Sequence, residues 1–338
     1  MQGQSPDELS AAQSGDQAAF ARLVQPYRRE LRAHCYRMAG SIHDADDLMQ
    51  DSLLRVWKGL PRFERRANLR TWLYRVTTNA CLDALEKRSG RMLPMDLGPA
   101  AGPNTTIGPP RLDPIWLEPC PSDLDASLSP AADVRYDQRE SVALAFLVAL
   151  QLLPPKQRAV LILRDVLGWQ ADECAELLEL SVASVNSALQ RARDTIEQRR
   201  GDRASPEVVD AETSALLGQY VKAWELADVR TLVALLREDA TLAMPPLSEW
   251  IQGATAIGAS IGGMVFSPAG PGAFQMVRTD ANGLPAFAAY QRDPESGEFR
   301  ATAIHLLEVR QGRVASIVAF LNPSLFEVFG LPLLLAKE

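Results

Sequence analysis

A tight turn between two short amphipathic segments, over residues 165 to 193, constrains the fold of this chain more than any other feature. Apolar residues recur at helical spacing at Cys174, Ala175, Leu177 and Leu178 before the turn, and at Val182, Val185 and Leu189 after it. Ser181 offers an N-cap hydroxyl to the second segment. The pattern predicts a helix-turn-helix, and the alternative is an ordinary helical hairpin in a bundle.

The second helix of this pair is expected to turn a row of small and amide side chains outward. The row begins at Ser181 and continues with Ala183, Ser184, Asn186, Ser187 and Gln190. Such side chains suit base edges in a DNA major groove, and Arg191 and Arg193 follow for phosphates.

A second informative stretch lies near the start of the chain. Residues 44 to 57 predict a helix with an acidic first turn, whose residues Leu48, Leu53, Val56 and Trp57 can face a core. An arginine-rich turn from Arg62 to Arg66 follows, and then a long helix from Asn68 to Arg88.

These two helices, followed by the helix-turn-helix, resemble the sigma-70 superfamily of bacterial transcription initiation factors, in its extracytoplasmic-function group. The resemblance covers residues 15 to 90 and 138 to 195. It implies two all-α domains whose partners are core RNA polymerase and promoter DNA.

The residues after about 204 have a different pattern. Helical segments at 207 to 227 and 229 to 237 precede strand-like runs at 302 to 310 and 313 to 321, which indicates an α+β unit. The segments Tyr220 to Trp224, Asp239 to Pro246 and Phe320 to Pro323 resemble those of SnoaL-like cones. The expected fold is therefore multidomain: two all-α helical sigma domains, the second a helix-turn-helix, plus an α+β SnoaL-like cone.

Proline and charge indicate where these domains meet. Residues 92 to 137 hold 9 of the 23 prolines and read as a linker between domains at 1 to 91 and 138 to 200, with the cone at 204 to 338. Within the linker, Ile115, Trp116 and Leu117 either dock on a domain surface or form a local turn cluster. The net charge of −7 is uneven, because residues 1 to 91 are basic and the linker and cone are acidic, which suits local contact with DNA.

The sequence indicates neither a membrane nor a cofactor. It has no apolar run of about 18 residues and no secretion signal, so we expect a cytoplasmic protein. The four cysteines are far apart and no histidine lies at ligand spacing, which favours buried or incidental thiols over a metal site or disulfides.

The resemblance places recognition of the promoter's minus-ten element on the second long helix and the turn before it. The expected DNA contacts there are Arg62, Arg65, Arg66, Asn68, Arg70, Arg75 and Asn79. Opening a duplex is helped by a protein that traps an unstacked base, and charged and polar groups at a helix start suit that task. Arg70 and Arg75 are interpreted as phosphate contacts rather than solvated surface, and Trp72 as core.

The acidic helix has two interpretations. An acidic run is most often a simple helix start. The resemblance implies in addition that Asp47, Leu48, Gln50 and Asp51 bind the polymerase. The sequence departs from the family on the recognition helix, where many relatives carry basic residues and this chain has Asn186 and Ala188. Asn186 can still form hydrogen bonds with a base, but the attraction of this helix for phosphates is expected to be weaker.

The cone raises the question of catalysis. Asp239, Asp280, Tyr290 and His305 are candidate acid or base groups, and the expected walls and polar groups of a pocket are Met244, Trp250, Phe287, Tyr290, His305 and Phe320. No pair has a spacing typical of chemistry, and a lone strand histidine is usually structural. We interpret the cone as a non-catalytic regulator with a small-molecule ligand, and an isomerase or cyclase tethered to a DNA-binding module is the alternative. The minus-ten helix favours the sigma factor, because a tethered enzyme needs only a helix-turn-helix.

Overall fold

The structure is a computed structural model that describes residues 6–64, 68–86, 90–102, 107–112, 116–125, 144–200 and 210–335. The chain divides into two compact units. The helical unit consists of residues 1–91 and 123–202, and the C-terminal unit of residues 92–122 and 203–338. An internal segment of the chain, residues 92–122, therefore belongs to the C-terminal unit.

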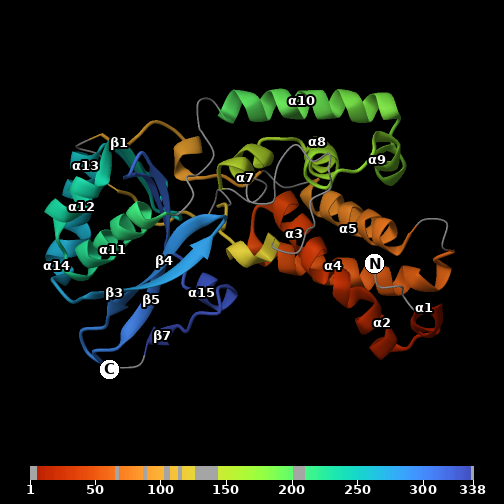
Figure 1. Cartoon of the computed structure of the whole chain (residues 1–338), viewed down its shortest axis with the longest axis horizontal. Helices are drawn as coiled ribbons and strands as arrows, with labels where there is room; N and C mark the ends of the chain where they lie inside the picture. Colours follow the sequence, from red (N-terminus) through yellow and green to blue (C-terminus); the bar gives the residue numbers. More distant parts are fainter. Residues whose placement is uncertain are drawn as a thin grey trace. The chain divides into compact units, whose positions relative to one another are not determined.

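The helical unit contains two groups of helices. The first group comprises α1 (Pro6–Gln13), α2 (Gln17–Val24), α3 (Arg28–Ala39), α4 (Ile42–Gly59) and α5 (Leu69–Leu85). The second comprises α7 (Leu144–Gln151), α8 (Pro155–Leu161), α9 (Ala171–Leu178) and α10 (Val182–Arg200), with a π-helical turn at Ile162–Val166 after α8. Helix α10 packs across α7, α8 and α9, and α8 and α9 in turn contact α5 (Figure 1).

The predicted helix-turn-helix is confirmed. Helix α9 ends where Glu179 adopts a left-handed conformation with φ of 55°, and α10 starts after Ser181. The Ser181 hydroxyl accepts a hydrogen bond from the Ser184 backbone N–H at 3.1 Å, as expected of an N-cap. The apolar residues predicted to face inward are buried in both helices, except Val182. This residue is 43% exposed, so its assignment to the core was wrong. Val182 is the first residue of α10, one turn before the buried stripe that begins at Val185.

The C-terminal unit is built on one sheet with the strand order β2-β1-β6-β5-β4-β3, and β7 pairs with β5. The strands are β1 (Leu236–Ala243), β2 (Trp250–Gln252), β3 (Phe274–Ala281), β4 (Leu284–Arg292), β5 (Phe299–Arg310), β6 (Arg313–Phe320) and β7 (Leu334–Leu335). The helices are α11 (Ala211–Glu225), α12 (Val229–Leu235), α13 (Ala254–Ile261), α14 (Ser267–Ala269) and α15 (Leu325–Val328). Helices first and a sheet afterwards confirm the predicted α+β class.

The two faces of this sheet are covered differently. Helices α11 to α14 gather on one side of the sheet (Figure 1), where Tyr220 and Trp224 of α11 join the main core. The C-terminal tail supplies Leu325 and Phe326, which are both fully buried, and the Phe326 ring packs edge-on against Tyr290 at 5.1 Å. Among the described residues, no helix is long and apolar enough to cross a membrane.

Candidate nucleic-acid interface

The outward row predicted on α10 is present. Ser181, Ala183, Ser184, Asn186, Ser187, Gln190 and Arg191 are all exposed. Beneath them, Val185, Ala188, Leu189, Ala192 and Ile196 form a buried stripe. Because this stripe holds α10 against the other helices, the exposed row is presented on a rigid helix and its side chains remain available for base edges.

Two residues of α10 differ from their expected placement. Arg193 is half-buried and makes two hydrogen bonds to the buried Asp165 carboxylate, at 2.8 and 2.6 Å, so it fixes α10 to the π-helical turn. Ala188 is only 7% exposed, so its place on the exposed face was wrong. The departure from the family pattern on that face therefore rests on Asn186.

Helix α5 presents a second candidate surface. Trp72, Arg75 and Asn79 follow one another at helical spacing and are all partly exposed. Trp72 stacks on Phe63 with ring centroids 4.9 Å apart, yet it keeps part of its surface in solvent, so its assignment to the core was incomplete. Sequence reasoning missed this aromatic surface, because an aromatic residue at helical spacing is most often core.

Two other residues predicted to contact DNA, Arg70 and Asn68, form hydrogen bonds within the helical unit. The Arg70 guanidinium donates to both Glu30 carboxylate oxygens, to Oε1 at 3.1 Å and to Oε2 at 2.7 Å, and lies 5.0 Å from the centre of the Tyr74 ring. The Asn68 side chain caps α5 by accepting a hydrogen bond from the Thr71 N–H at 2.7 Å. Arg62 is exposed at the end of the short helix Leu60–Arg62, and Arg65 and Arg66 lie outside the described residues.

The acidic helix α4 presents only part of its predicted polymerase surface. Asp47 and Gln50 are exposed, and Asp51 is partly exposed with an ion pair to Arg55 at 2.9 Å. Leu48 is 8% exposed and packs inward, so its assignment to the partner-facing surface was wrong. Its position agrees with the apolar period of the helix, which placed it in the core.

The six residues expected to form one pocket in the cone lie on both faces of the sheet. Phe287 and His305 are paired across β4 and β5 and face α11, where both rings approach Tyr220. Phe320 pairs with Ile304, the neighbour of His305, and successive strand residues face opposite sides. The Tyr290 hydroxyl donates to the Pro332 carbonyl of the tail at 2.9 Å. The single pocket predicted from these residues was therefore wrong.

His305 lies in a space filled by aromatic rings. Its Nδ1 is 3.0 Å from the Tyr220 hydroxyl oxygen, and the Trp224 ring lies 4.7 Å away. Burial lowers the pKa of His305 to about 4, so the imidazole is neutral at pH 7. The exposed Asp239 pairs with Arg237 at 2.8 Å, and Asp280 lies 3.9 Å from Arg278. Neither carboxylate bonds to His305 in the described part of the chain, so these groups form no acid and base pair.

Of the remaining two wall candidates, Trp250 is bonded to the internal segment 92–122. Met244 is partly buried at the edge of the core. The Trp250 indole N–H donates to the Gly98 carbonyl at 2.9 Å, and the Ala101 N–H donates to the Trp250 carbonyl at 2.7 Å.

The docked segment, residues 92–122, has a second contact at the β3–β4 turn. The Asn282 N–H donates to the Cys120 carbonyl at 3.0 Å, and the Asn282 side-chain oxygen accepts from the Cys120 N–H at 3.1 Å. Leu117 and Cys120 are fully buried, and the Leu117 N–H bonds within the segment, to the Met92 carbonyl at 3.0 Å, so docking of the apolar cluster on a domain surface stays a prediction. Ile115 lies outside the described residues. Trp116 bonds within the segment, to the Arg111 carbonyl at 2.7 Å.

Comparison with protein families gives three matches along the chain. Residues 23–91 match Sigma-70 region 2, residues 143–196 match Sigma-70 region 4, and residues 217–317 match the SnoaL-like domain. The ECF RNA polymerase sigma factor SigG of Mycobacterium tuberculosis is 45% identical over 320 residues, which cover 93% of this chain and 84% of that protein. SigW of Bacillus subtilis is 26% identical, over 57% of this chain and 95% of its own length.

A solved structure agrees on the fold. The crystal structure of the extracytoplasmic function sigma factor SigJ of Mycobacterium tuberculosis has a TM-score of 0.58 at 24% identity, and the match covers 93% of this chain and 99% of that chain. Together with the helix-turn-helix, the α5 surface and the near full-length match to SigG, this places the chain among the extracytoplasmic-function RNA polymerase sigma factors, in a form that has a C-terminal SnoaL-like domain.

Proposed function

We propose that the helical unit directs core RNA polymerase to a defined promoter, with α5 binding the minus-ten element and α10 reading an upstream element. The exposed row of α10 is the observation that supports this most strongly, because small and amide side chains on a rigid helix match base edges. On α5, Arg75 and Asn79 follow the partly exposed Trp72 at helical spacing, which suits stacking of an unpaired base on the Trp72 ring.

The proposed contacts differ in kind. Asn186 and Gln190 read bases, Arg191 meets phosphate, and Arg62 and Arg75 meet the backbone near the melted strand. Arg70 and Arg193 act mainly through the fold, because both are engaged by buried or half-buried carboxylates. Between Val182 and Gln198, the part of α10 whose side chains are described, Arg191 is the one exposed cation, so tight promoter binding requires the polymerase as a second source of affinity.

The polymerase is proposed to bind the exposed end of α4 through Asp47, Gln50 and Asp51. Substituting Asp47→Arg and Asp51→Arg together should weaken binding to core polymerase at least about tenfold, because two attractive charges become repulsive at a surface. Competition with a second sigma factor for core measures this. Glu86→Arg, which changes an exposed acid beyond the end of α5, is the control, and equal effects of both changes would exclude a specific role of α4.

The decisive test of the proposed function is run-off transcription with core polymerase. Residues 1–200 contain both proposed DNA-reading surfaces, and the match to SigW, which spans 194 residues and 95% of that sigma factor, supports a unit of this size. We expect the 1–200 chain to start transcripts at a specific promoter. A chain that binds core polymerase but starts none would contradict the proposal.

The cone is proposed to regulate the sigma factor in cis, through the docked segment. This segment joins the two DNA-reading domains in sequence but is bonded to the cone at Trp250 and Asn282. An enzymatic role is less well supported, since His305 is enclosed by rings and bonds to neither candidate carboxylate. A small-molecule ligand of the cone would act most directly where the segment docks.

Asn282 allows a matched test of this regulation. Asn282→Gly keeps the left-handed backbone at φ of 53° and removes the side-chain bond to Cys120. Gln311→Gly makes the same change in the β5–β6 turn, where φ is also 53°. We expect Asn282→Gly to raise run-off transcription and protease sensitivity of residues 92–137, and Gln311→Gly to change neither. Equal behaviour of the two variants would contradict regulation through the docked segment.

A further inference from the structure

A glutamine of the first helix holds the backbone that leads to the aromatic surface of α5. Gln13 is the last residue of α1, and its side-chain amide donates to the Leu60 carbonyl at 3.1 Å and to the Phe63 carbonyl at 3.0 Å. These carbonyls belong to the first residue of the short helix Leu60–Arg62 and to its C-cap residue. Because carbonyl groups at a helix end lack partners within the helix, Gln13 fixes the backbone where the chain leaves this helix.

Phe63 in turn supports Trp72. The Phe63 side chain is buried, and its ring centroid lies 4.9 Å from that of Trp72 at an interplanar angle of 34°. A Cβ atom at Gly59, the last residue of α4, would lie 3.2 Å from Trp72 Cζ2, so the lack of a side chain there makes room for the indole. Phe63 and Gly59 thus set the position of the indole, while part of Trp72 stays exposed. We call Gly59, Phe63 and Trp72 the aromatic platform.

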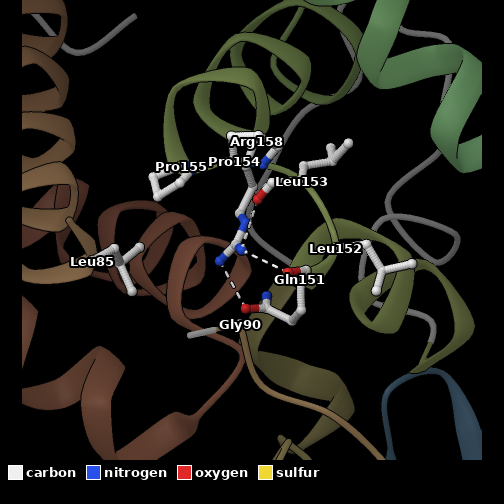
Figure 2. Close-up of a pocket in the computed structure, with 8 residues that line it drawn as sticks. All are labelled: Leu85, Gly90, Gln151, Leu152, Leu153, Pro154, Pro155 and Arg158. Carbon is white, nitrogen blue, oxygen red and sulfur yellow. Dashed lines mark hydrogen bonds between the residues drawn. The ribbon is translucent and has the colours of Figure 1, made fainter. Parts of the chain in front are cut away.

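The aromatic platform is separate from the cavity found in the described part of the helical unit. That cavity has a volume of about 250 Å³ and is lined by Leu85, Gly90, residues 151–155 and Arg158 (Figure 2). The Arg158 guanidinium donates to the Gln151 side-chain oxygen at 2.7 Å beside it. None of these lining residues is among those proposed to contact DNA, so an unpaired base has to be held at the surface of α5, by stacking.

We propose that Gln13 is a positioning residue for promoter opening, because its hold on the Phe63 carbonyl keeps the aromatic platform in the orientation in which Trp72 stacks on an unpaired base. This inference rests on the proposed function, which assigns base stacking to Trp72, and adds α1 to the elements on which opening depends. Stacking gains most from a ring that is already in place, since ordering a side chain on binding costs free energy.

Opening of the minus-ten element by core polymerase with the full chain tests this role. The fluorescence of 2-aminopurine, in place of an adenine of that element, reports unstacked bases, and a gel shift at low temperature measures binding before opening. Gln13→Met keeps the side-chain length and removes the donor. We expect it to lower the ratio of open to closed complexes about tenfold, as for two lost neutral hydrogen bonds, with closed binding unchanged. Gln13→Arg restores donors and should recover opening. Gln17→Met, the same change at an exposed position of α2, is the control.

Gly59→Ala tests the aromatic platform from its other side. Alanine favours a helix over glycine, so urea unfolding should show no loss of stability, whereas the new Cβ displaces the Trp72 indole by a few tenths of an ångström. We expect a lower ratio of open to closed complexes, in the same direction as for Gln13→Met. Loss of opening without loss of stability is a result that a merely structural role of the platform would not give. Unchanged opening in Gly59→Ala would show that the exact position of the indole does not matter and would overturn the proposal.

Abasic sites in the minus-ten element connect Gln13 to the stacked base. Trp72→Ala should impair opening, and an abasic site at the stacked position should remove that effect, because no base remains to stack on the ring. The effect of Gln13→Met should disappear at the same position. An effect of Gln13→Met that persists there, or none on intact DNA, would overturn the positioning role while base stacking by Trp72 stands. If Trp72→Ala opens intact promoter as well as the unsubstituted chain does, base stacking fails and the positioning role fails with it, and run-off transcription still decides the rest of the proposed function.

Discussion

The two helices proposed to contact DNA differ in how far their polar side chains take part in the fold. Helix α10 is fixed by an apolar stripe from Val185 to Ile196, and its exposed polar side chains are largely independent of the fold. Helix α5 also has a buried apolar face, which includes Leu69, Leu73 and Leu85, but polar contacts add to it, through Arg70 to Glu30 and through Thr78 to His34. Polar residues of α5 therefore stabilise the helix that is also proposed to bind DNA, and substitutions on the two helices should have different consequences.

The largest expected difference concerns pH. His34 is fully buried, its Nε2 lies 2.9 Å from the Thr78 hydroxyl, and burial lowers its pKa to about 3. Below pH 6.5 the unfolded chain takes up a proton that native His34 does not, so this contribution to stability is present above pH 6.5 and is lost as the pH falls towards 3. Between pH 7 and 4.5 His34 should account for a loss of about 2.5 kcal/mol.

Urea unfolding of the full chain and of His34→Gln at both pH values measures this contribution. His305, which has the same sign, is present in both chains and cancels in the difference. Equal losses in the two chains would show that His34 does not hold α5 in a pH-dependent way.

The next effect is on stability at neutral pH. Arg70→Ala leaves Glu30, whose side chain is 12% exposed, without its guanidinium partner, and should lower the free energy of unfolding by about 2 kcal/mol. Gln190→Ala on α10 should change it by less than about 0.5 kcal/mol. Similar values from urea unfolding of both variants would remove the proposed difference between the helices.

Promoter discrimination should show the reverse pattern. Asn186→Ala should reduce the preference for the specific upstream element by about 1–3 kcal/mol, as for the loss of a bidentate base contact, and leave stability unchanged. Binding of the holoenzyme to specific and scrambled upstream elements measures this. A uniform loss on both DNAs would instead indicate a phosphate contact for this side chain.

The smallest effect is the exposed ion pair between the two helical domains. Arg75 and Glu179 have side chains 41% and 77% exposed, so a double-mutant cycle should give a coupling of about 0.2–1 kcal/mol. Glu179→Gln should nevertheless strengthen DNA binding at low salt, because it frees Arg75 and removes a negative charge. Unchanged binding across a salt series would place DNA elsewhere on α5.

The sequence predicted residues whose position follows from local spacing. The outward row of α10, the Ser181 cap and the buried face of α9 all depend on neighbours within one or two turns. The roles of Arg70 and Arg193 were harder to predict, because their carboxylate partners, Glu30 and Asp165, lie 40 and 28 residues away in the sequence. Charge and exposure alone could not distinguish an arginine that binds phosphate from one that fixes a helix.

The arrangement of side chains in the cone was harder to predict than the roles of these arginines. Its class follows from the order of helical and strand-like segments, but which residues face a common space depends on strand register. Phe320 and His305 are separated by the sheet because Phe320 pairs with Ile304 and not with His305. One residue of register decides this, and no local pattern in the sequence fixes it.

The docking of residues 92–122 on the cone also determines how far the chain can reach. The 52 residues from 92 to 143 connect the two DNA-reading domains, and if fully extended they would span about 180 Å. With 92–122 held on the cone, only the 21 residues from 123 to 143 remain outside the docked segment, and these reach about 70 Å at most. Under the proposed regulation in cis, the C-terminal domain sets the usable length of the tether, and a signal that releases the segment extends the range of promoter spacings without altering any residue proposed to contact DNA.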